Sequence, residues 1–155
     1  MKKFLLTVIL VVFTFLNFET FAQDQGFGLG IMIGKPTAIS SKYWLSENTA
    51  ADFGLGYSIL DDAGFTLHTD FLYHQDGLFE SSEKIVVHYG FGARLKANDN
   101  NDTSLGARGV IGLTWMSKQS PIDAFIELAP VFKLIPKTAL GFDLALGARY
   151  YFNTK

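Results

Sequence analysis

Residues 140–152 read LGFDLALGARYYF, and their bulky apolar residues alternate with small or charged ones at a period of two. This spacing indicates a β-strand, because successive side chains of a strand point to opposite faces, and it does not fit the spacing of a helix. One face would carry leucine and aromatic side chains. The other would carry glycine and alanine together with Asp143 and Arg149.

The same alternation recurs along the chain from Gly26 onward, in runs separated by turn residues. It predicts about eight strands, and most of them have the length of roughly ten residues with which a tilted strand crosses an outer membrane. The predicted strands are Gly26–Gly34, Thr37–Leu45, Thr49–Leu60, Gly64–His74, Lys84–Lys96, Ser104–Met116, Pro121–Phe132 and Thr138–Phe152.

The N-terminal segment has the order of a secretory signal peptide: Met1-Lys2-Lys3, an apolar run from Phe4 to Phe18, and a cleavage point after Ala22. A single membrane anchor is the alternative, but the run is shorter than the roughly 20 residues that a spanning helix needs. We therefore expect residues 1–22 to direct export by the Sec pathway and to be removed, leaving residues 23–155 as one domain.

The composition narrows the classes of function. The formal net charge is −2, so nothing in the charge attracts nucleic acid. The chain has no cysteine, which excludes both disulfides and lipoprotein attachment. Aromatic residues make up 15% of the chain and there are 15 glycines, yet no segment after the signal peptide is apolar for long enough to cross a bilayer as a helix. A membrane role would therefore require strands.

The residues of the polar face indicate which face lies inside. That face is mostly glycine with a few charges, and glycine would weaken a strand that faces water. A closed barrel of about eight strands has an interior just wide enough for side chains to fill, so small residues have a steric reason there. We expect a closed antiparallel up-and-down transmembrane β-barrel. The alternative is a soluble periplasmic lipocalin-like barrel with the faces inverted, which would bind a small apolar ligand.

The charged and histidine side chains of the glycine face are predicted to form a structural ion-pair lattice inside the barrel. Buried charges persist when they are paired, and the guanidinium fork matches a carboxylate well. Most lysines lie instead in turns or at strand ends, with Lys42 as the exception. The predicted lattice residues are Asp52, His68, Asp70, His88, Arg94, Arg108, Glu127, Asp143 and Arg149.

Aromatic residues of the apolar face tend toward the strand ends, as in the aromatic girdles of membrane barrels. Trp44 departs from this pattern because it falls on the polar phase, and Gly109 and Pro130 lie within strands at positions where we expect β-bulges. The aromatic residues of the predicted girdles are Phe27, Tyr43, Tyr57, Phe65, Tyr73, Trp115, Tyr150 and Phe152.

Five stretches together resemble a family of small, largely uncharacterised outer-membrane barrels of Gram-negative bacteria, similar in fold to the OmpA-type transmembrane domain. They are GKPTAIS (34–40), KYWLS (42–46), DFGLGYS (52–58), PIDAFIELAP (121–130) and GARYYF (147–152). The resemblance implies an outer-membrane location in contact with lipid. Gly147, Tyr150 and Phe152 resemble the signal by which barrel-assembly machinery recognises a last strand, although three residues follow Phe152 here where the usual pattern ends on the aromatic.

The search for chemistry centres on the histidines. His68, His74 and His88 share the inward phase with Asp70, which raises the possibility of a metal site or a general base, but the spacing matches no metal motif and hydrogen bonding inside the barrel is favoured. A lipid-A-modifying barrel enzyme would need a serine, a histidine and a carboxylate at the lipid-facing rim, and the histidines face inward. We predict no catalytic residue, no cofactor and no metal.

The function expected is therefore that of a monomeric outer-membrane protein with a structural or binding role and no open pore. An even number of strands places both ends of the barrel chain in the periplasm. The longest connection, Gln75–Glu83, would then also face the periplasm, against the rule of short periplasmic turns. Either the strand count is off by one near Phe79, or this barrel has a long connection on that side.

Overall fold

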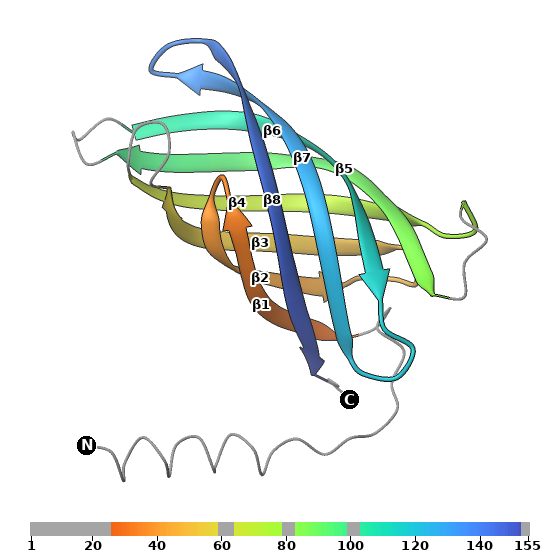
Figure 1. The fold of residues 1–155 in the computed structure, drawn as a ribbon. Helices are drawn as coiled ribbons and strands as arrows, with labels where there is room; N and C mark the ends of the chain where they lie inside the picture. Colours follow the sequence, from red (N-terminus) through yellow and green to blue (C-terminus); the bar gives the residue numbers. More distant parts are fainter. Residues whose placement is uncertain (1–25, 59–63, 79–82, 99–102, 153–155) are drawn as a thin grey trace, which may run out of the picture.

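The computed structural model describes residues 26–58, 64–78, 83–98 and 103–152, which form a closed barrel of eight antiparallel strands in sequence order (Figure 1). No helix in this part of the chain is long and apolar enough to cross a membrane. The predicted closed up-and-down barrel is confirmed. The strands are β1 (Phe27–Gly34), β2 (Thr37–Trp44), β3 (Thr49–Ser58), β4 (Gly64–Gln75), β5 (Lys84–Asn98), β6 (Thr103–Met116), β7 (Ile122–Ile135) and β8 (Ala139–Phe152).

The strand boundaries differ from the predicted ones by a few residues, inward at some strand ends and outward at others. β7 continues to Ile135, because Ile135 pairs with Leu105 of β6. β5 continues to Asn98, which pairs with Gly64. Ladder pairing with a neighbouring strand thus prolongs strands through residues that resemble turn residues in the sequence.

The barrel closes where β8 pairs with β1, from Phe27↔Phe152 to Gly34↔Ala145. The end of β4 and the start of β5 lie at the same end of the barrel as Phe27 and Phe152, as the strand order requires. The described residues contain the eight strands counted from the sequence, so the alternative count near Phe79 is wrong for them. Phe79 itself lies outside the described residues.

The expected bulges at Gly109 and Pro130 are wrong. The pairs Arg108↔Val131 and Ile111↔Leu128 keep one register across this region, and the register shift lies instead between Leu105 and Gly106. Proline has no amide hydrogen, so it interrupts the hydrogen bonds of a ladder without requiring an extra residue.

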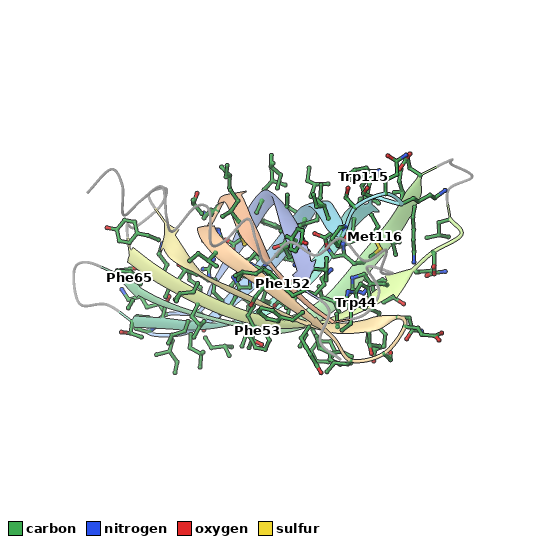
Figure 2. All side chains as sticks on the ribbon, turned by 90° about the horizontal axis from the view of Figure 1, so that it is seen from below. Trp44, Phe53, Phe65, Trp115, Met116 and Phe152 are labelled. Atoms are coloured by element: carbon green, nitrogen blue, oxygen red, sulfur yellow. The ribbon has the colours of Figure 1, made fainter. Side chains whose placement is uncertain are left out.

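The glycine-rich phase faces the barrel interior and the apolar phase faces outward. Arg108 and Arg149 are each 2% exposed, whereas Phe91 is 65% exposed. Figure 2 shows the side chains standing out from the barrel wall, with Phe53 among them. This arrangement contradicts the alternative of an inverted barrel with an apolar interior. Trp44, which departs from the apolar phase, is buried as its position in the strand requires.

The inward glycines allow the barrel to be narrow. A Cβ atom built at Gly30 would overlap the backbone carbonyl oxygen of Ala148, and one at Gly90 would overlap that of Phe71. Gly109 differs, because a Cβ atom there would meet only the Cγ of Pro130, at 3.5 Å. Gly30 and Gly90 are thus required by neighbouring backbone, whereas the outward Gly109 is not.

Gly30→Ala should therefore lower the free energy of unfolding by about 1–3 kcal/mol, because the backbone of β8 has to move. Gly109→Ala is the matched control and should change it by no more than about 0.5 kcal/mol. Urea unfolding of the refolded protein in lipid vesicles measures both. Equal effects of the two substitutions would contradict the steric reason given for the inward glycines.

Candidate functional site

The predicted lattice residues all lie in the barrel interior. The structure divides them into two ion-pair networks, centred on Arg108 and on Arg149, with the histidines placed beside them. The buried members predicted from the sequence are Asp52, His68, Asp70, His88, Arg94, Arg108, Glu127, Asp143 and Arg149.

The Arg108 network joins five neighbouring strands, β4 to β8. The Arg108 guanidinium donates to three carboxylates: Nε to Asp70 Oδ2 at 3.0 Å, Nη1 to Asp143 Oδ2 at 3.2 Å, and Nη2 to Glu127 Oε1. Arg94 donates from Nη1 to both oxygens of Asp143, at 2.6 and 2.7 Å. Asp143 of β8 therefore bridges the arginines of β5 and β6.

The Arg149 network lies closer to the ends of the strands near Phe152 and joins β8 to strands on both of its sides. Arg149 Nε donates to Asp123 Oδ1 at 3.1 Å, and Nη1 donates to Asp52 Oδ2. The Tyr151 hydroxyl donates to the second oxygen of Asp123 at 2.7 Å. The guanidinium also lies over the Phe125 ring, 4.0 Å from its centroid. This cation is thus held by charge on its edges and by an aromatic ring on its face.

A lysine–histidine group extends the Arg149 network. Lys42 Nζ lies 4.0 Å from Asp123 Oδ2 and 3.0 Å from His74 Nε2. The His74 ring packs against Trp44, with centroids 4.4 Å apart. Lys42 was the one strand-interior lysine in the sequence, and the structure buries it completely.

Three ionisable residues that the structure buries in the interior were not predicted there from the sequence: Asp123, Lys96 and Tyr151. Asp123 lies on the same face of β7 as Glu127, so the alternation could have placed it in the interior. Its position close to the turn residue Pro121 obscured this. Lys96 was expected at a strand end in contact with water, but β5 continues past it and the side chain is 5% exposed. The buried charges of the described residues are therefore five basic and five acidic, so the interior is balanced by its own side chains.

The histidines lie in this interior as well. All three are buried, so none reaches the outward face that a lipid-A-modifying enzyme would require. His88 Nδ1 lies 2.9 Å from the Thr114 hydroxyl, and both residues are at most 1% exposed, so a substrate has no access to this pair. In the part of the chain that the structure describes, no three histidine, cysteine or carboxylate side chains converge as a metal site would.

The residues of the predicted assembly signal lie along β8 on both faces. Gly147 faces inward, where a Cβ atom would meet the carbonyl oxygen of Ile31 at 2.5 Å and the ring of Phe125. Tyr150 and Phe152 belong to the outward phase, and their rings form an edge contact with centroids 5.1 Å apart. Their recognition by assembly machinery stays a prediction.

Arg149→Leu should lower the free energy of unfolding by about 3–5 kcal/mol, because Asp52 and Asp123 would lose their guanidinium partner while remaining buried. Lys137→Leu removes the same charge from an exposed turn and should change it by about 0.5 kcal/mol or less. Urea unfolding in vesicles compares the two. An unaffected Arg149→Leu protein would mean that the side chain is in contact with water.

Tyr151→Phe should cost about 1.5–3 kcal/mol, the contribution of a hydrogen bond to a charged group. Tyr150→Phe is the control on the adjacent, outward-facing residue and should have little effect. The same unfolding measurement applies, and a larger loss for Tyr150→Phe would argue against the assignment of Tyr151 to the interior network.

No model of a known protein family and no curated protein matches the chain. Its fold is similar to that of the N-terminal β-barrel domain of Pseudomonas aeruginosa OprF, with a TM-score of 0.57 over 81% of this chain and 95% of that one. The two sequences are 17% identical, so the likeness concerns the fold. The chain is thus an eight-stranded antiparallel barrel of the same architecture as that domain.

Proposed function

We propose that the protein is an integral outer-membrane β-barrel, monomeric, with a structural or binding role and with neither catalysis nor an open pore. One observation carries the proposal: an apolar outer wall surrounds a charged, ion-paired interior. Phe65 and Leu140, which belong to different strands, are each 64% exposed. An apolar surface this continuous would cause association in water, whereas lipid is the solvent that suits it.

The height of the apolar wall fits a bilayer. On β8 the outward apolar residues extend from Leu140 to Phe152, and these are the residues that alternate in the sequence. At a rise of about 3.4 Å per residue and a tilt of roughly 40°, this length spans about 30 Å along the barrel axis. That height is close to the thickness of the hydrocarbon core of a typical bilayer.

Aromatic residues lie toward both rims of the wall, as membrane interfaces favour. At one end, the Tyr57 and Phe65 rings form an edge contact with centroids 5.4 Å apart. At the other end lie Trp115 and Phe152, near the ends of β6 and β8. Figure 2 shows Phe65 and Trp115 toward opposite ends of the barrel.

The proposal includes the route to the membrane. Residues 1–22, which lie outside the described residues, act as the signal peptide. The end of the barrel that carries Phe27, Phe152 and the start of β5 faces the periplasm, and assembly machinery recognises Gly147, Tyr150 and Phe152. Support comes from the order of the N-terminal residues and from the even number of strands.

The interior supports a role without transport. The Arg108 and Arg149 networks cross the barrel at two successive levels, and eight strands enclose only as much space as side chains fill. The wall and the connections between strands are then the surfaces on which the protein acts. This arrangement supports a structural or binding role.

The expressed protein should remain in the outer-membrane fraction after a urea or carbonate wash. After detergent extraction it should migrate differently on gels before and after boiling. A closed barrel satisfies all backbone hydrogen bonds between its strands, so it stays folded in cold detergent and unfolds on boiling. Recovery in the soluble periplasmic pool, with no heat-dependent shift, would contradict the proposal.

A further inference from the structure

The outer wall carries a shallow groove across β4 to β7. Its volume is 460 Å³, and its lining is almost wholly apolar, including Tyr73, Tyr89, Phe91, Gly109, Ile111 and Pro130. This volume lies within the range of about 300–1,000 Å³ found for small-molecule sites. The groove is therefore a hollow of useful size in a wall whose exposed residues include many large apolar side chains.

Gly109 and Pro130 create the hollow. Gly109 is the one glycine on the outward phase among the described strands, and it pairs with Phe91 on β5 and lies beside Pro130 on β7. The only atom within 4 Å of a Cβ built at Gly109 belongs to Pro130. The Phe91 ring therefore does not cover Gly109. The glycine and the short proline ring thus form a floor below the level of the surrounding side chains.

Aromatic rings form one wall of the groove. The cross-strand neighbours Tyr73 and Tyr89 stack with centroids 5.9 Å apart at an angle of 22°, and Phe71 and Phe91 lie 6.2 Å apart. Phe71 also makes an edge contact with Tyr73, at 5.1 Å. These contacts join the four rings in a chain. Three of the rings, those of Tyr73, Tyr89 and Phe91, line the groove, and Ile111, which pairs with Tyr89, lines it beside them.

The groove extends in one direction along the barrel wall. The tyrosine pair lies toward the end of the barrel that carries Phe27 and Phe152, since Tyr73 is close to the end of β4, whereas Gly109 lies near the middle of β6. Tyrosine combines an apolar ring with a polar tip and favours the level where acyl chains meet headgroups. The apolar part of the groove thus leads from that level toward the middle of the wall.

We propose that this groove binds one acyl chain of a phospholipid from the leaflet on the side of Phe27 and Phe152, with the headgroup beside Tyr73 and Tyr89. This inference rests on the proposed function, because that function places the outer wall in lipid. A flexible linear chain can fill a narrow apolar hollow such as this one, whose lining is mostly apolar. The protein thereby holds one lipid chain more firmly than the rest of its lipid shell.

The test is photocrosslinking of the refolded mature protein in phosphatidylethanolamine vesicles that contain a phospholipid with a diazirine within its acyl chain. We expect adducts on the peptides of Tyr89, Phe91 and Ile111 to exceed those on the outward residues of β1 and β8 several-fold. Gly109→Leu fills the hollow and should abolish this excess. Ala93→Leu adds the same side chain to an exposed position on β5 outside the lining and should preserve it.

Uniform labelling around the barrel, or an excess that survives Gly109→Leu, would overturn the proposal. Crosslinks between two copies at the groove would overturn it as well, by showing a protein occupant. Failure of the proposed function is distinguishable, because the protein would then not enter vesicles, would show no heat-dependent migration and would give no lipid adducts on any strand. Unfolding curves of both leucine variants establish that each has folded.

Discussion

Pairing between guanidinium and carboxylate groups that are buried inside the barrel is the interaction on which the fold depends. Arg108 binds three carboxylates from three strands, and Asp143 connects it to Arg94. Removing either kind of partner leaves a charge buried without compensation, which costs far more than the pair contributes when intact. The networks therefore favour one register of the strands around them over others that would separate the charges.

The narrow interior imposes the second constraint. Long charged side chains and histidine rings occupy the interior around Arg108 and Arg149, so the residues that face them must be small. Gly54 and Gly112 illustrate this, because a Cβ atom at either position would overlap the rings of His68 and His88 respectively. Glycine in these strands is therefore a packing requirement, although it weakens an ordinary strand.

The outer wall has no such steric constraint, because most of its side chains are exposed to the surroundings of the barrel. Aromatic pairs such as Tyr73 and Tyr89 nevertheless contact across strands and stiffen the wall locally. The presence of glycine at position 109, on the outward face, is not explained by packing in the interior, because the inward neighbours there are Arg108 and Val110. A lipid chain held in the resulting groove explains it.

The sequence by itself determined the strands, their number, and the face that each residue occupies, because a period of two depends only on local backbone geometry. It also indicated that Arg94, Arg108 and Arg149 share the glycine face. Only the tertiary structure decided which carboxylate each arginine meets, because partners such as Arg149 and Asp52 are brought together by closure and register, not by spacing along the chain. The burial of Lys96 and the register shift at Leu105 likewise depend on ladder pairing between neighbouring strands. The alternation of residues within one strand carries no information about that pairing.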